Sequence, residues 1–136
     1  MLKYNLCLIR QGDKVLLLSR NIPCWMGCWN GVGGKLEPQE TARASMLREI
    51  EEETGITDID VHFKGLITWS TVEGNGFGGL YLYTADLARD YPYPTPVRTN
   101  EGILEWKEME WIMHPENIGV AYNLPKSMAL AFRDNR

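Results

Sequence analysis

The sequence is poor in cysteine and histidine, which argues against disulfide-rich and zinc-finger folds. Its three cysteines, Cys7, Cys24 and Cys28, are an odd number and do not suit the paired framework of a small secreted protein. A zinc site built on Cys24 and Cys28 would need two further ligands, and neither His62 nor His114 has finger-like spacing to them. We therefore expect unpaired thiols with no metal.

Long apolar runs and an excess of basic charge are also missing. The apolar run in residues 1–10 is short and interrupted by polar residues, so it predicts neither a signal peptide nor a membrane helix, and we expect a cytoplasmic protein. A formal net charge of -4 predicts no surface for polymeric nucleic acid, although a small phosphorylated substrate screened by a cation stays compatible. No Gly-x-Ser-x-Gly elbow is present, and no Gly-Lys-Ser/Thr follows the glycine-rich residues 73–79, which we interpret as a hairpin tip.

What is present suits one ordinary globular domain over residues 1–136, with 44% hydrophobic and 24% charged residues. Apolar runs and breakers predict alternating strands and helices. The expected strands are residues 6–8 and 15–18 around a turn at 11–14, then 61–70, 80–87 and 105–112; the expected helices are 41–54 and 125–133; residues 21–34 and 91–96 are expected to be loops.

Three carboxylates of the first helix share one side of it. Glu49, Glu52 and Glu53 stand at positions i, i+3 and i+4, where helical side chains are neighbours, whereas Glu51 points away. For the helix alone, a solvated acidic face stabilised by arginines is the alternative interpretation. The apolar residues that we expect to face a sheet beside these acids are Met46, Leu47 and Ile50.

The residues around this helix form a longer pattern with fixed spacing. Its positions are Gly34, Glu40, Arg48, Glu49, Ile50, Glu52, Glu53, Gly55 and Ile56, with gaps of five and seven residues after the first two. This pattern resembles the signature of the Nudix (MutT-type) hydrolase family at every specified position. The resemblance implies an α+β fold, an α/β/α sandwich in which helices flank a mixed central sheet.

The same resemblance implies a chemistry and a set of roles. Mg²⁺, for which Mn²⁺ substitutes, would assist water in cleaving a nucleoside diphosphate-linked substrate. Its ligands would be Glu49, Glu52, Glu53 and the backbone carbonyl of Gly33, with Glu52 or Glu53 also activating the water. Arg48 and Glu40 would orient these carboxylates. Glu101 lies in a segment with the pattern Glu-Gly…Glu-Trp, which is typical of MutT. It is a candidate for a further metal ligand or base, and Glu105 is the weaker candidate.

The segment 27–35 narrows the choice of substrate. Its Trp-Asn-Gly-Val-Gly-Gly-Lys portion resembles the oxidised purine nucleoside triphosphatases, which implies that Asn30 reads a base edge; a turn-forming role is the alternative. By the same likeness Asn5 would line the base pocket, and Lys35 is a further candidate for substrate binding. Arg20 would contact phosphate or remain a solvated arginine. Aromatic residues that could stack on a base or simply pack are Trp25, Trp29, Phe77 and Trp106.

The prediction is therefore hydrolysis of a purine nucleoside triphosphate such as 8-oxo-dGTP to the monophosphate and pyrophosphate. Two alternatives stay open: a pyrophosphatase of ADP-ribose or a dinucleotide, and a Nudix-like module that senses nucleotides without catalysis. The expected partner is a small nucleotide, and the chain is expected to be a monomer or a homodimer.

Overall fold

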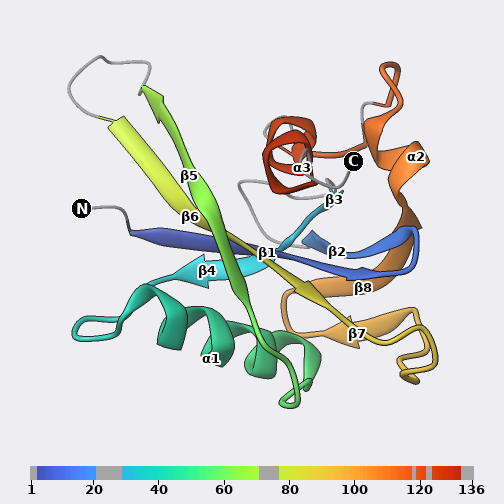
Figure 1. Ribbon diagram of the computed structural model, residues 1–136, viewed down its shortest axis with the longest axis horizontal. Coiled ribbons are helices and arrows are strands. Elements are labelled where there is room, and N and C mark those ends of the chain that lie inside the picture. The colour runs from blue at the N-terminus through green and yellow to red at the C-terminus, as the bar shows by residue number, and fades with distance from the viewer. Residues whose placement is uncertain (1–2, 21–28, 71–76, 118, 122–123, 133–136) are drawn as a thin grey trace.

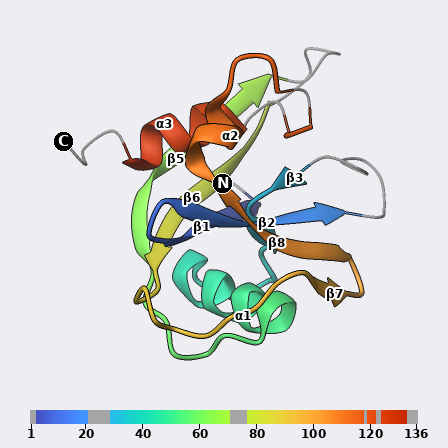
Figure 2. The same cartoon turned by 90° about the vertical axis from the view of Figure 1, so that its right-hand side faces the viewer.

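A mixed β-sheet lies between one helix on one face and two on the other in a computed structural model of the chain (Figures 1 and 2). The structure describes residues 3–20, 29–70, 77–117, 119–121 and 124–132. Helix α1 (Ala42–Thr54) covers one face, and α2 (Met109–Met113) and α3 (Leu124–Phe132) cover the opposite face. This is the expected α+β sandwich of helices on both sides of a mixed sheet.

The sheet follows the order β5-β6-β1-β2-β8-β7, with β4 also paired to β1 and β3 to β2. Strands β1 and β6 are parallel, and the other pairs are antiparallel. The strands are β1 (Tyr4–Gln11), β2 (Lys14–Arg20), β3 (Trp29–Asn30), β4 (Val32–Lys35), β5 (His62–Ser70), β6 (Phe77–Asp86), β7 (Val97–Thr99) and β8 (Gly102–Glu108).

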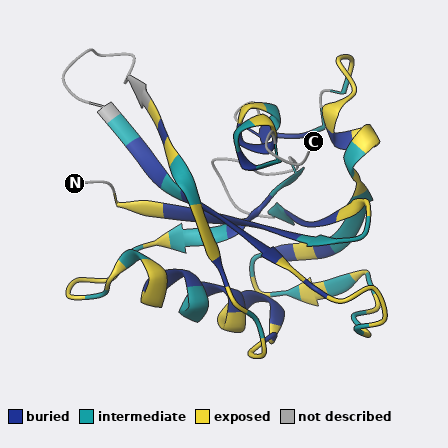
Figure 3. Cartoon of the chain, viewed as in Figure 1, coloured by how far each residue is buried: buried dark blue, intermediate teal, exposed yellow. Residues whose placement is uncertain are grey.

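The central residues of β1 (6–9) and of β2 (15–18) are all apolar because both faces of these strands are buried there (Figure 3). Cys7 and Ile9 of β1 pack in the core under α1, together with Met46 and Ile50 of the helix. The alternate residues of β1 and β2 pack in a second core under α2 and α3; they are Leu6, Leu8, Val15 and Leu17.

Helix α1 begins and ends where the sequence predicts. The side chain of Thr41 accepts a hydrogen bond from the Ala44 amide, 3.1 Å away, and so caps the first turn. Gly55 ends the helix at φ +80°, a conformation that side-chain-bearing residues rarely adopt. Leu47 is only partly buried, beside the fully buried Met46 and Ile50.

Two predictions of secondary structure were wrong. The expected loop 21–34 contains strands β3 and β4 in its second half, and the expected strand 105–112 divides into β8 and helix α2. Pairing with β2 sets the start of β8, because Gly102 lies opposite Arg20. The other elements are confirmed within a few residues, including the turn before Lys14 and the extended connector 91–96.

The described part of the chain contains no helix that is long and apolar enough to span a membrane. Cys7 is a buried free thiol whose pKa is raised by burial. Cys24 and Cys28 lie outside the described residues, as do residues 73–76 of the glycine-rich segment, whose last three residues belong to β6.

Candidate functional site

The three glutamates predicted as one set differ sharply in their surroundings. Glu49 is 9% exposed and Glu53 is 7% exposed, so both carboxylates are buried at the base of α1. The side chain of Glu52 is 58% exposed, and Glu51 is exposed as predicted. The helix therefore presents Glu49 and Glu53 inward and Glu51 and Glu52 at the surface.

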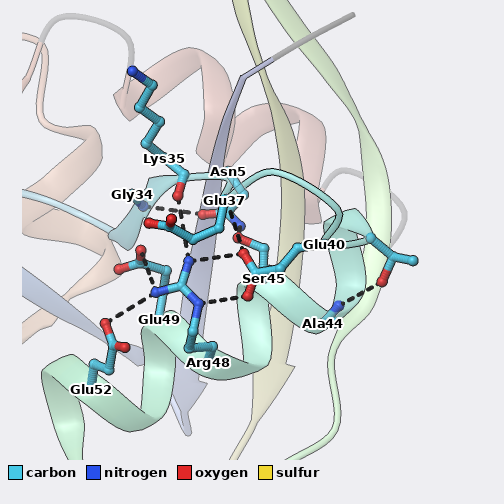
Figure 4. Close-up of polar contacts among 11 residues, drawn as sticks. Asn5, Gly34, Lys35, Glu37, Glu40, Ala44, Ser45, Arg48, Glu49 and Glu52 are labelled. Carbon is cyan, nitrogen blue, oxygen red and sulfur yellow. Dashed lines mark hydrogen bonds and ion pairs between the residues drawn. The ribbon is translucent and has the colours of Figure 1, made fainter.

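Arg48 connects three of the predicted acids (Figure 4). Its guanidinium holds Glu40 in a two-point contact, with Nε 2.6 Å from Oε2 and Nη2 3.0 Å from Oε1. Its Nη1 atom lies 3.1 Å from Glu52 and 3.3 Å from Glu49. Planar two-point pairing fixes direction as well as distance, so the arrangement has the orienting contacts predicted for Arg48 and Glu40.

The pKa values follow from these contacts. Hydrogen bonding to Arg48, helped by the Glu37 amide, lowers the pKa of Glu40 to about 2. Burial raises the pKa of Glu49, and Arg48 opposes that rise. The same acids raise the pKa of Arg48.

Glu53 stands apart because no cationic side chain pairs with it. Neither of its carboxylate oxygens has a hydrogen-bond partner among the described residues, although both are buried. Burial, together with the negative charges of Glu101 and Glu49, raises its pKa to about 9. Among the described residues, Arg20 is the cation recorded as opposing this rise, and it lies 3.0 Å from Glu101.

Glu101 reaches this group from a different element. It lies in the turn between β7 and β8, next to Gly102, which pairs with Arg20 of β2. Its charge acts on both Glu49 and Glu53, so the structure brings together the acids of the helix and the acid predicted outside it. Glu105 lies on the face of β8 that is turned away from α1, and its nearest recorded partner is Lys107 at 3.9 Å.

Two glycines of β4 allow the helix to approach the sheet. A Cβ atom on Gly34 would stand 2.6 Å from Oε2 of Glu49, and one on Gly33 would stand 2.1 Å from the Asn5 carbonyl oxygen. Any side chain would therefore displace the carboxylate or separate β4 from β1. This requirement explains glycine at both positions.

Asn5 supports the site from β1 instead of lining an open surface. The side chain is 3% exposed, its Nδ2 donates to Ser45 Oγ at 3.0 Å, and its Oδ1 accepts from the Gly34 amide at 3.1 Å. Both polar ends of Asn5 are thus engaged in joining β1, β4 and α1. The sequence interpretation missed Ser45, whose only signal is a small polar residue on the buried side of the helix.

The remaining predicted residues surround this group. Arg48 donates to the carbonyl of Lys35 at 3.5 Å, and the exposed Lys35 side chain extends away from the glutamates (Figure 4). Asn30 is half-buried and accepts from the Gly31 amide at 2.9 Å, which is the turn-forming contact weighed as its alternative role. Trp106 donates to the Tyr93 carbonyl and packs on the core under α1. Trp25 and the side chain of Phe77 lie outside the described residues.

The donor set fits a hard divalent cation. Oxygen donors are what Mg²⁺ and similar ions prefer, and two buried carboxylate oxygens without partners lack the positive charge they require. Within the described residues, no three acidic, histidine or cysteine side chains are grouped so that they could hold a metal ion as they stand. Glu52 is turned toward Arg48, and binding through all three helix acids would need that contact to loosen.

Comparison with known proteins agrees with this geometry. The family model described as the NUDIX domain matches residues 4–130. An uncharacterized Nudix hydrolase, YvcI of Bacillus subtilis, is 32% identical over 108 residues, which are 79% of this chain and 66% of that protein. The oxidized purine nucleoside triphosphate hydrolase of Mus musculus is 29% identical over 109 residues, 80% of this chain and 67% of its own. The chain thus spans about two thirds of these relatives.

Solved structures show the same fold. A MutT protein from Bacillus halodurans is 27% identical, with a TM-score of 0.69 over 96% of this chain and 80% of that chain. The NUDIX domain of Shewanella oneidensis NrtR, crystallised with ADP ribose, gives a TM-score of 0.73 at 17% identity, covering 94% of this chain and 86% of its own. The second likeness concerns the fold alone.

Proposed function

We propose, because this chain belongs to the NUDIX domain family, that it hydrolyses a phosphoanhydride bond of a nucleoside diphosphate-linked compound with a divalent cation. The observation that carries the proposal is the environment of Glu53. Its two carboxylate oxygens are buried without a hydrogen-bond partner in the described structure, and the negative charges of Glu49 and Glu101 lie nearby. Members of the family use divalent cations, and Mg²⁺ suits this set of oxygen donors best. Mn²⁺ is expected to substitute for it.

In this proposal the acids hold the cation, and one of them also activates the attacking water. Glu49, Glu52, Glu53, Glu101 and the Gly33 carbonyl would hold the cation. The cation supplies charge that screens the phosphates and lowers the pKa of water. To Glu52, which is exposed to solvent and lies 3.1 Å from Arg48, we assign the role of orienting the attacking water and taking its proton, with Glu53 as the other candidate base. Arg48 and Glu40 keep these carboxylates in position.

The substrate that we propose is a purine nucleoside triphosphate, in particular an oxidised one such as 8-oxo-dGTP, cleaved to the monophosphate and pyrophosphate. The mouse relative supports this choice, as does the Trp-Asn-Gly segment that contains Asn30. Asn30 uses its oxygen on the Gly31 amide, which leaves its amino group as the donor we assign to the base edge. Arg20 and Lys35 would contact phosphate oxygens.

A second candidate substrate is ADP-ribose or a dinucleotide. The observation that favours it is the likeness in fold to the NrtR domain that was crystallised with ADP ribose. The sensing module without catalysis is the third candidate, and the retained acids Glu49, Glu52 and Glu53 oppose it.

The decisive experiment is a panel of nucleotides incubated with Mg²⁺ while phosphate and pyrophosphate release are measured. We expect turnover by the wild type and loss of it in the presence of a chelator. Tight binding without turnover across the panel would favour the sensing module. Turnover of ADP-ribose in preference to triphosphates would move the assignment to the second candidate.

The oxidised-purine assignment has its own test. We expect kcat/KM to be higher for 8-oxo-dGTP than for dGTP, and the ratio to fall in Asn30→Ala because a base-edge donor is lost. Equal efficiency on the two nucleotides in the wild type would rule the assignment out.

A further inference from the structure

The ammonium of Lys107 lies against two tryptophan rings on the face of the sheet opposite α1. Its Nζ atom is 4.6 Å from the ring centroid of Trp29 and 4.9 Å from that of Trp111. The nearest recorded carboxylate oxygen, from Glu105, is 3.9 Å away, which is a weak pairing. We call Trp29, Lys107 and Trp111 the tryptophan–lysine slot.

Backbone contacts fix the position of one wall of this slot. Trp29 donates through its amide to the Gly119 carbonyl and accepts through its carbonyl from the Ala121 amide, both at 2.8 Å. The other wall, Trp111 on α2, is 39% exposed. A ring held by its backbone and a ring open to solvent together make a platform that a flat ligand can enter.

The slot lies beside an open hollow and on the strands that lead to the acidic site. The hollow of about 300 Å³ is lined by Lys14, Trp106, Lys107, Glu108 and Trp111. Trp29 pairs with Ser19 of β2, and the next residue, Arg20, forms the ion pair with Glu101. Trp29 thus lies next to the residue that pairs with Glu101, although the slot is on the sheet face opposite α1 and its acids.

The chemistry of the slot selects a kind of ring. Aromatic faces stack on any base, whereas a lysine ammonium has three donors and no acceptor. The O6 and N7 atoms of guanine are both acceptors, but adenine presents an amino donor beside its N7. An ammonium therefore matches the guanine edge at both atoms and the adenine edge at only N7; an 8-oxoguanine edge offers it O6 alone, because oxidation at C8 places a hydrogen on N7.

We propose that the tryptophan–lysine slot binds the base of the nucleotide and that Lys107 makes it selective for a guanine-type edge. The inference rests on the proposed function only in taking a nucleotide as the ligand. When the base enters, it displaces the lysine stem from the ring faces, and the ammonium turns from the rings to O6 and N7. Lys107 is thus a specificity residue that stays distant from the reacting phosphates.

The test is calorimetric binding of GMP and AMP in the presence of a chelator, so that neither hydrolysis nor a cation contributes. We expect the wild type to bind GMP about tenfold more tightly than AMP, the discrimination typical of one lysine contact to a guanine edge. Lys107→Met keeps the length of the stem and should remove this preference, whereas Lys107→Arg should retain it. Trp111→Leu should weaken both ligands by a similar factor.

Lys14→Met is the matched control, because Lys14 lines the same hollow without a recorded ring contact. It should leave the GMP-to-AMP ratio unchanged. Equal affinity of the wild type for the two ligands, or a preference that survives in Lys107→Met, would overturn the proposal. A chain that hydrolyses no nucleotide but shows the lysine-dependent preference would refute the proposed function and leave the slot intact.

Discussion

Glu40 and Glu53 belong to the same signature and the same helix region, yet the protein treats them in opposite ways. Glu40 is bound at both oxygens by Arg48, and its pKa is lowered to about 2. Glu53 is buried, its carboxylate has no cationic hydrogen-bond partner among the described residues, and burial beside the acids Glu101 and Glu49 raises its pKa to about 9. The ordinary value for both is 4.5.

The difference separates acids that stabilise the fold from acids that await a ligand. A carboxylate that is paired with an arginine already has its charge compensated. A buried carboxylate without a partner lowers the free energy of unfolding until it binds a cation or a proton. Folded proteins retain such a cost mainly where function needs it. This contrast supports our proposal that Glu53 lies at the centre of the site.

Glu53→Gln tests the contrast with the largest expected effect. Hydrolysis should fall by several powers of ten, because a ligand to the cation is lost. In a chelator at pH 7 the melting temperature should rise, because the raised pKa of Glu53 means that folding must place a proton on this carboxyl, a cost that glutamine does not have. Mg²⁺ should raise the melting temperature of the wild type and not that of the variant.

The control for this change is Glu51→Gln, an acid of the same helix whose side chain is exposed. It should leave both activity and the response to Mg²⁺ unchanged. A Glu53→Gln protein that melts below the wild type in a chelator would show that Glu53 stabilises the fold, and the contrast with Glu40 would fail.

Gly34→Ala extends the comparison to the backbone that holds the acids. The added Cβ would meet Glu49 at 2.6 Å, so we expect a loss of activity of about 100-fold as this carboxylate is displaced. Gly55→Ala is the matched glycine change, since nothing lies within 4 Å of its Cβ and only its φ of +80° resists. It should lower the free energy of unfolding by about 1 kcal/mol and spare kcat. Equal kcat values for the two variants would contradict this account.

Arg48→Lys tests the arginine that pairs with Glu40, and it should lower activity less than the changes above. Lysine retains the charge but not the planar fork that holds Glu40, Glu49 and Glu52 together. We expect kcat to fall by about 10-fold to 100-fold, the range typical of residues that orient metal ligands. Arg43→Lys is the control, because Arg43 pairs with Asp60 away from these acids. If both variants retain full kcat, Arg48 has no orienting role.

The helix and its acids could be predicted because their signals are local. Thr41, the helical spacing of Glu49 and Glu53, and Gly55 lie within one short stretch, and each signal has a fixed distance along the chain. The contact of Glu101 with this group was predictable only through resemblance, since it depends on the pairing of Gly102 with Arg20 across the sheet.

What the sequence concealed depends on partners distant in the chain. Strands β3 and β4 have two and four residues, too few for a period to appear, and they form because β1 and β2 pair with them. Asn5 resembled a ligand-binding residue, and its two hydrogen bonds to Ser45 and Gly34 become visible only when α1 and β4 are in place. Burial of Glu53 likewise follows from packing and not from its neighbours in sequence.

Glu40→Gln should have the smallest effect of these changes, and the effect should appear in how the melting temperature depends on pH. Because the pKa of Glu40 is lowered in the folded protein, its contribution to stability is present above the unfolded value of 4.5 and is lost as the pH falls through about 2. We expect Glu40→Gln to melt below the wild type at pH 7, with a difference that shrinks steadily as the pH falls below 4.5. Thermal unfolding of both proteins across this range measures it, with Glu51→Gln as the reference. A difference that stays constant with pH would mean that Glu40 acts through packing, and its pairing with Arg48 would then explain nothing about its contrast with Glu53.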